Sequence, residues 1–186
     1  YERVDDEHYE PYFREFNPVK YDPRQWARIA KAAGMKYAVL TAKHHDGFCL
    51  FDSAQTDFKS TNTPCGRDLV REFVEAFRAE GLKVGLYFSL LDWHHPDFPE
   101  FDGIIHTDEY LKKNPRKGYD NYLKFMHAQI EELLTNYGEI GCLWFDTAMN
   151  MTPAQSRAIC DLVKSIQPNC IINGRIGNGA GEYMTT

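Results

Sequence analysis

Polar side chains that could take part in catalysis or ligand binding follow directly after four short apolar runs of this sequence. The runs cover residues 36–42, 83–91, 141–146 and 170–174. The third run is the most informative, because the letters CLWF are followed by the lone carboxylate of Asp146. A carboxylate at the end of a buried strand, screened from water by Trp144 and Phe145, suits a nucleophile or a general base. An Asp that caps the following loop is the alternative, and this strand end alone leaves both interpretations open.

The first run is followed by KHHDGF, which contains the adjacent pair His44 and His45. Neighbouring side chains of a regular strand face opposite sides, but a strand that turns into a loop allows both to reach one cleft. A neutral imidazole offers a hydroxyl one donor and one acceptor, so the pair suits a polyhydroxylated ligand. A metal site is the competing interpretation, although no HxH or HExxH spacing accompanies the pair. A structural role for one histidine, with Asp46-Gly47 as ordinary turn chemistry, is a further alternative.

The second run lies within LYFSLLDWHHPDFP and supplies two more candidate ligand contacts. Tyr87 can offer its hydroxyl, and Trp93 can serve as a stacking platform at the rim. A purely structural role, as a core tyrosine whose hydroxyl is hydrogen-bonded within the protein, is a strong alternative for Tyr87. The prolines that follow begin a long connection, reaching about Gly118, of the length typical of a lid or binding loop. Its histidines, including His95 and His106, are equally explained as solvated side chains.

The fourth run ends in INGR, where Asn173 and Arg175 leave the strand together. A guanidinium at this place can orient a carboxylate such as Asp146 or bind substrate oxygens. The glycines that follow belong to a loop, and no helix with Lys-Ser or Lys-Thr follows as a phosphate cradle requires.

Amphipathic helices separate the apolar runs and predict the architecture. Apolar stripes predict helices near 67–80 and 119–137, a third opening at Thr152-Pro153, and an earlier one opening at Asp22-Pro23. Short continuous apolar strands between helices are typical of parallel sheets covered on both faces. The alternation therefore indicates an α/β fold, either a barrel or a doubly wound sheet.

Polar groups from several strand ends that converge on one centre favour the barrel, since a (β/α)8 TIM barrel builds its site this way. A complete barrel takes about 250 residues, whereas this chain has 186 and about four β/α units. We therefore predict one domain over residues 1–186 that is roughly half of a catalytic barrel.

Composition excludes some partners and leaves the compartment open. The net charge is −6 with scattered Lys and Arg, so neither nucleic acid nor an anionic membrane is an expected partner. No apolar run has the length of a membrane span, and the N-terminal residues lack a signal pattern. The 5 Cys include no CxxC pair, and an odd number cannot all pair within the chain.

The order KHHDGF, YFSLLDW, LWFD and INGR resembles that of the family 29 glycoside hydrolases, the α-L-fucosidases, over essentially the whole chain. The resemblance implies that Asp146 is the nucleophile of a retaining α-L-fucosidase and forms a covalent glycosyl-enzyme intermediate. It implies no metal and no organic cofactor. Sugar contacts are implied for His44, His45, Tyr87, Trp144 and Arg175, and Trp93 stays a candidate platform.

Two parts of the family pattern have no counterpart in this chain. One is the first barrel strand with its sugar-binding His and the Glu-Trp pair that follows. The other is the general acid/base, the final Glu of a motif resembling GDYxTPE. Here GEYMTT stops before that position, and Glu182 matches the Asp of the motif. Because a retaining glycosidase needs both carboxyl groups, we expect the chain alone to have little or no activity.

The resemblance also sets expectations about partners and place. A fucosylated oligosaccharide or glycoconjugate is the expected substrate, and a secreted, periplasmic or lysosomal location is usual for the family. Half a barrel has unpaired strand edges, so an isolated chain is expected to self-associate. Two competing functions are a non-catalytic fucose-binding module that keeps the histidines and Trp93, and a metal-dependent barrel hydrolase that uses the His44-His45 pair.

Overall fold

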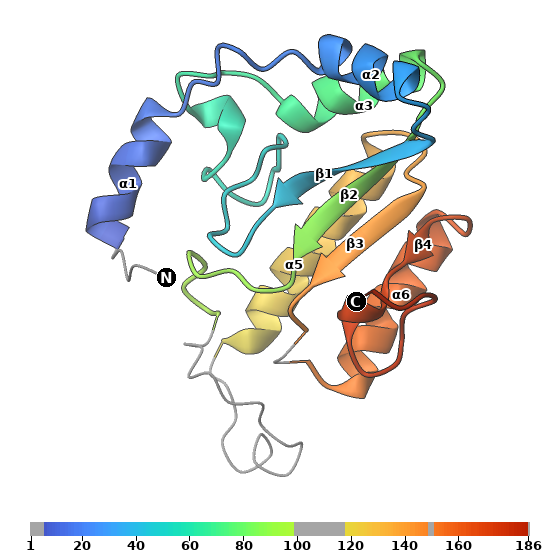
Figure 1. The fold of residues 1–186 in the computed structure, drawn as a ribbon. Coiled ribbons are helices and arrows are strands. Elements are labelled where there is room, and N and C mark those ends of the chain that lie inside the picture. Colours follow the sequence, from blue (N-terminus) through green and yellow to red (C-terminus); the bar gives the residue numbers. More distant parts are fainter. Residues whose placement is uncertain (1–5, 99–117, 149–150, 186) are drawn as a thin grey trace.

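The computed structural model describes residues 6–98, 118–148 and 151–185 and contains one parallel sheet (Figure 1). Its strands lie in sequence order and pair only in parallel. The four strands are β1 (Tyr37–Lys43), β2 (Lys83–Ser89), β3 (Cys142–Asp146) and β4 (Ile171–Ile172). Strands that are adjacent both in sequence and in space, with helices between them, match the expected barrel segment.

The connecting helices agree with the sequence prediction, and their ends have the expected caps. Four were predicted: α2 (Pro23–Ala32), α3 (Leu69–Ala79), α5 (Tyr119–Thr135) and α6 (Pro153–Ile166). Helix α6 begins with a capping box in which Thr152 and Gln155 exchange hydrogen bonds. Helix α1 (Asp6–Glu15), which contains Pro11, was not predicted. A proline inside a segment normally argues against a helix.

The two faces of the sheet differ in what covers them. Leu86, Phe88, Leu143 and Phe145 point to the helical side and are completely buried. Figure 1 shows α5 and α6 behind the sheet and the other face toward the viewer. On that second face Tyr37 keeps 65% of its surface exposed. The expectation of strands covered on both faces is therefore wrong for the edge strand β1, whereas most residues of the central strands β2 and β3 are buried.

A register shift near the end of β1 decides which side chains reach the second face. Thr41 pairs with Tyr87, but Lys43 pairs with Phe88, so β1 has one residue more than β2 between these pairs. Such a bulge reverses the alternation of side chains. Lys43 consequently lies on the helical side with Phe88, and His44 follows on the side of Tyr87.

In the part of the chain that the structure describes, no helix is long and apolar enough to cross a membrane.

Candidate active site

The candidate site is centred on Asp146, the last residue of β3. Its Oδ2 atom accepts a hydrogen bond of 2.8 Å from the Tyr87 hydroxyl of β2. Its Oδ1 atom accepts one of 2.7 Å from Nε of Arg175 and a second from Nη2 of the same residue. The Asp146 side chain is 12% exposed, whereas that of Arg175 is 44% exposed. The carboxylate is thus held from both sides at the end of the sheet.

The surroundings of Asp146 keep it ionised. Burial raises the pKa of its carboxyl group, but hydrogen bonds from Tyr87 and Arg175 and the charge of Arg175 outweigh this, so the pKa lies below its ordinary value. The Thr147 hydroxyl acts in the same direction. The pKa of Tyr87 is raised mainly by burial and further by the hydrogen bond to Asp146 and the charge of this carboxylate, so the Tyr87 hydroxyl stays a proton donor. A carboxylate that is ionised at neutral pH suits a nucleophile better than an acid.

Thr147 holds an unfavourable backbone conformation directly after the carboxylate. Its φ is +60°, in the left-handed region that β-branched residues rarely adopt. Backbone strain of this kind persists where the surrounding structure enforces it, and it is frequent at functional sites.

A row of flat side chains extends from Asp146 across the open face. Arg175 lies over the Trp144 ring, 5.3 Å from its centroid. Trp144 stacks on Tyr87 at 5.3 Å, and Tyr87 stacks on His44 at 5.3 Å with the rings only 7° from parallel. Apolar ring faces with polar atoms at their edges form a surface that suits a sugar, which has both apolar C–H and hydroxyl groups.

His45 and Trp93 stand at the edge of this row. His45 Nδ1 lies 2.6 Å from the Ser89 hydroxyl, whose own proton is directed to the Leu91 carbonyl at 2.9 Å. His45 therefore donates from Nδ1, which makes Nε2 an acceptor that has no hydrogen-bond partner among the described residues. Burial and then the neighbouring His44 lower the pKa of His45, which favours this neutral form. Trp93 is 57% exposed, and its backbone N–H donates to the His45 carbonyl at 2.8 Å.

Asn173 fixes the loop that carries Arg175. Its side chain accepts from the Phe145 N–H at 2.8 Å and donates to the Phe145 carbonyl at 2.9 Å. This pair replaces the strand ladder where β4 ends, so the short 3-10 helix Gly174–Ile176 begins beside the end of β3. Arg175 thereby reaches Asp146.

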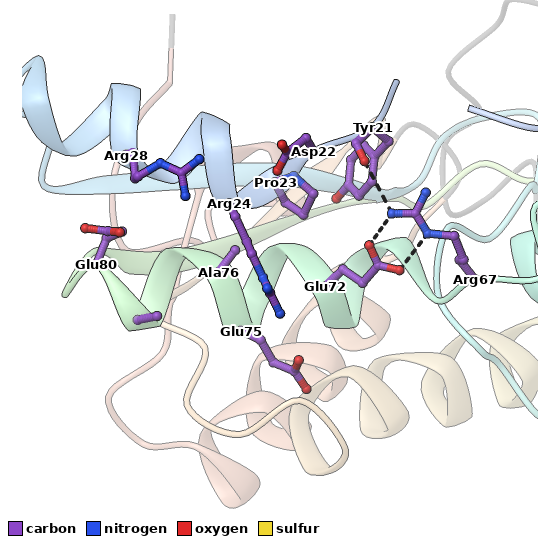
Figure 2. A pocket seen from close by; sticks show the side chains of 11 residues that line it. Tyr21, Asp22, Pro23, Arg24, Arg28, Arg67, Glu72, Glu75, Ala76 and Glu80 are labelled. Carbon is purple, nitrogen blue, oxygen red and sulfur yellow. Dashed lines mark hydrogen bonds and ion pairs between the residues drawn. The ribbon is translucent and has the colours of Figure 1, made fainter. Parts of the chain in front are cut away.

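A separate groove lies away from these residues and is formed by helix surfaces. It measures about 520 Å³ and is lined by α2, α3 and the residues before them (Figure 2). Its Arg67 is already engaged, since its side chain binds Glu72 at 2.8 Å and 2.5 Å and the Tyr21 carbonyl at 3.3 Å. The strand ends, where an α/β barrel places its ligands, are the better candidate.

The family model for α-L-fucosidases matches residues 1–186. The chain belongs to the α-L-fucosidase family. An Arabidopsis thaliana α-L-fucosidase 1 is 35% identical over 164 residues, which are 84% of this chain and 29% of the plant protein.

Solved α-L-fucosidases share the fold of the chain. Isoenzyme 1 from Paenibacillus thiaminolyticus is 53% identical with a TM-score of 0.84, over 95% of this chain and 43% of that one. The Lactobacillus casei α-L-fucosidase AlfC, solved with α-L-fucose product, is 33% identical with a TM-score of 0.87. This match covers 99% of this chain and 61% of the AlfC chain. The chain thus spans less than two thirds of the fucosidases it matches, which confirms the prediction of a partial domain.

The prediction of the α-L-fucosidase family is confirmed, and the comparisons do not support the fucose-binding module or the metal-dependent hydrolase. No three His, Cys, Asp or Glu side chains within the described ranges form a group able to hold a metal ion. The structure brings together Asp146, Arg175, Trp144, Tyr87 and His44 and places His45 and Trp93 beside them. Their roles in binding and catalysis stay predictions.

Two details of the sequence analysis are wrong. Phe145 does not screen Asp146, because it points to the helical side and packs against Phe88. His95 is not a freely solvated side chain, since it packs on Phe125 with 4.5 Å between ring centroids. Most of the connection before Gly118, including His106, lies outside the described residues.

The groups that support the site were not predicted from the sequence. Ser89 was overlooked, although it is the direct register partner of Asp146. Thr147 and the pair Lys43 and Asp92 were also not recognised. The sequence did contain a signal for them. A Ser or Lys at the end of a buried strand is itself buried and therefore requires a polar partner.

Removing the Tyr87 hydroxyl tests one of the two supports of the carboxylate. In the full-length protein, Tyr87→Phe is expected to raise the pKa of Asp146, because a hydrogen bond to the ionised form is lost. The acid limb of the kcat/KM profile should then move to higher pH on an aryl α-L-fucoside. An unchanged acid limb would show that the Tyr87 hydrogen bond does not set the ionisation of Asp146.

Proposed function

We propose that the complete protein hydrolyses terminal α-L-fucosyl linkages with retention of configuration and that Asp146 is its nucleophile. The supporting observation is the ionised carboxylate held by Tyr87 and Arg175 beside aromatic rings and imidazoles, in a chain of the α-L-fucosidase family. A catalytic carboxylate on one strand end, surrounded by groups from the neighbouring strand ends, is how barrel enzymes build their sites.

The proposed sugar site is formed by the open face of the strand ends. His44 and the Nε2 acceptor of His45 would bind fucose hydroxyls, for which a neutral imidazole is a suitable partner. The stacked rings of Tyr87 and Trp144 would contact the apolar C5 methyl corner of this deoxy sugar. Trp93, being exposed at the rim, would contact the group to which fucose is attached. A fucosylated oligosaccharide or glycoconjugate is therefore the proposed substrate class.

The proposed reaction has two displacements at the anomeric carbon. In the first, a carboxylate oxygen of Asp146 forms a bond to this carbon while the glycosidic C–O bond breaks, and an acid gives a proton to the leaving oxygen. In the second, water attacks the same carbon, Asp146 leaves, and the conjugate base of that acid takes the water proton. Arg175 and Tyr87 hold the attacking oxygens throughout and stabilise the carboxylate as it is released.

The surroundings of Glu182 do not suit a general acid. It is exposed, its carboxylate pairs with Lys164 at 2.8 Å, and it accepts the Ile172 N–H at 2.8 Å. The charge and hydrogen bond of Lys164 lower the pKa of Glu182, whereas a general acid needs a raised pKa. No carboxylate other than Asp146 contacts Tyr87 or Arg175 in the described parts of the chain.

A comparison of leaving groups tests the missing acid. The 186-residue chain is expected to hydrolyse a fucosyl disaccharide at a negligible rate, because an unactivated leaving oxygen needs a proton. An aryl α-L-fucoside with a good leaving group needs less help and should react faster, releasing a phenolate that absorption detects. Robust turnover of the disaccharide would show that the chain already contains its acid.

A further inference from the structure

Lys43 and Asp92 form an ion pair that is almost sealed from water. Nζ of Lys43 lies 2.9 Å from Oδ2 of Asp92, with side-chain exposures of 0% and 3%. The same ammonium lies 4.5 Å from the centroid of the Phe88 ring and 5.4 Å from that of Phe125. The desolvation cost of such a pair cancels much of its attraction, so an apolar pair of similar size would often stabilise the fold as well. Fold stability alone therefore does not account for these two charges.

The pair joins the two loops that carry the proposed sugar contacts. Lys43 directly precedes His44, and Asp92 directly precedes Trp93. The second carboxylate oxygen, Oδ1 of Asp92, accepts the backbone N–H groups of His94 at 3.2 Å and His95 at 3.0 Å. The carboxylate thus organises its own loop while it binds the end of β1.

The turn after the two histidines also rests against this carboxylate. Gly47 has a φ of +78°, and a Cβ atom there would lie 2.3 Å from Oδ1 of Asp92. Only glycine fits this close approach. Asp92 is therefore in contact with the chain on both sides of His44 and His45.

Lys43 is the residue at which the β1 bulge takes effect. Because its side chain is held on the helical side by Asp92 and the rings, the next residue, His44, must point to the opposite face and stack on Tyr87. The Trp93 N–H bond to the His45 carbonyl completes the link between the loops. The direction of the imidazoles thus depends on where Lys43 is anchored.

We propose that Lys43 and Asp92 are positioning residues for fucose recognition: their buried ion pair fixes the bulge and the two loops so that His44 and His45 face the sugar. This inference rests on the proposed function. Asp146 is held by Tyr87 and Arg175 and not by either of these residues, so their effect is on sugar binding through the histidines.

The test uses the full-length protein with both charges removed in Lys43→Met/Asp92→Asn. Met can occupy the aromatic surroundings, and Asn keeps an oxygen for the His94 and His95 N–H groups. The inhibition constant for free α-L-fucose is expected to rise about tenfold or more, since small displacements of binding groups have effects of this size. The acid limb of kcat/KM should stay in place, because Tyr87 and Arg175 still hold Asp146.

A matched control is the ion pair Arg67–Glu72 in the groove between α2 and α3 (Figure 2). It also links a loop to another element, but it lies away from the strand ends. Arg67→Met/Glu72→Gln is expected to leave the fucose inhibition constant unchanged. Thermal unfolding of both double variants separates a loss of folded protein from a loss of binding by folded protein.

The outcomes are distinct. A folded Lys43→Met/Asp92→Asn variant that binds fucose as tightly as the wild type would overturn the positioning role. If this variant does not fold, Lys43→Gln/Asp92→Asn, which leaves no unpaired charge buried, should still raise the inhibition constant about threefold, and an unchanged constant would overturn the proposal. Wild-type protein that neither binds nor hydrolyses α-L-fucosides would instead refute the proposed function.

Discussion

Asp146→Ala is expected to lower kcat of the full-length protein on an aryl α-L-fucoside by about 10⁴-fold or more. This loss corresponds to about 5.5 kcal/mol of transition-state stabilisation. It follows from the removal of the atom that bonds to the anomeric carbon, for which Tyr87 and Arg175 offer no replacement. The inhibition constant for fucose should change only severalfold, because His44 and His45 remain.

Asp161→Ala is the matched control for this substitution, because Asp161 is an exposed carboxylate on α6. Its kinetic constants should equal those of the wild type. If Asp146→Ala kept most of the wild-type kcat, Asp146 would be a structural carboxylate and the nucleophile would lie elsewhere. If it lost fucose binding and turnover in equal proportion, Asp146 would act in binding and not in the chemical step.

Arg175→Met is expected to cause the second largest effect, a fall in kcat/KM of about 10²-fold at neutral pH, of the size typical for one lost electrostatic contact in an active site. Arg175 is one of the groups that keep the pKa of Asp146 below its ordinary value. Without it, burial raises this pKa, and the acid limb of the kcat/KM profile moves to higher pH. The Met side chain keeps contact with the Trp144 ring while it removes the charge.

The change in the pKa of Asp146 also affects how the stability of the folded protein depends on pH. A carboxyl group with a lowered folded-state pKa stabilises the fold above the pKa of the unfolded chain, and this contribution disappears as the pH falls through the folded-state value. Arg175→Met should therefore reduce the drop in thermal stability between neutral and acid pH. Exposed Arg157→Met, on α6, is the control. An acid limb and a stability profile both equal to wild type would contradict the proposed control of Asp146 by Arg175.

Much of the architecture could be predicted because four of the five described α-helices carry local sequence signals. Apolar stripes and caps such as Thr152 with Gln155 are properties of neighbouring residues. The convergence of Arg175 on Asp146 was also predictable, since both leave adjacent parallel strands at the same edge. Helix α1 was not, because Pro11 contradicts the local helix rule.

What the sequence could not predict depends on register. The bulge between Thr41 and Lys43 reverses which side chains face the sugar, and no local pattern marks it. The orientation of Phe145 away from Asp146 and the pairing of Ser89 with His45 depend on how the strands align. The buried Lys43–Asp92 pair joins residues 49 positions apart, a distance at which sequence spacing carries no signal.

The most direct test of the account is to identify the carboxylate that becomes bonded to the sugar. Full-length protein would be incubated with a fluorinated α-L-fucosyl fluoride, whose leaving group needs no acid and whose ring fluorine slows release of the intermediate. Mass spectrometry of the digested protein should find the fluorofucosyl mass on the peptide with LWFDTAMN, at Asp146. Two results would contradict the assignment of Asp146 as the nucleophile. One is the same mass on a different carboxylate, and the other is complete hydrolysis with inversion of configuration and no labelled peptide.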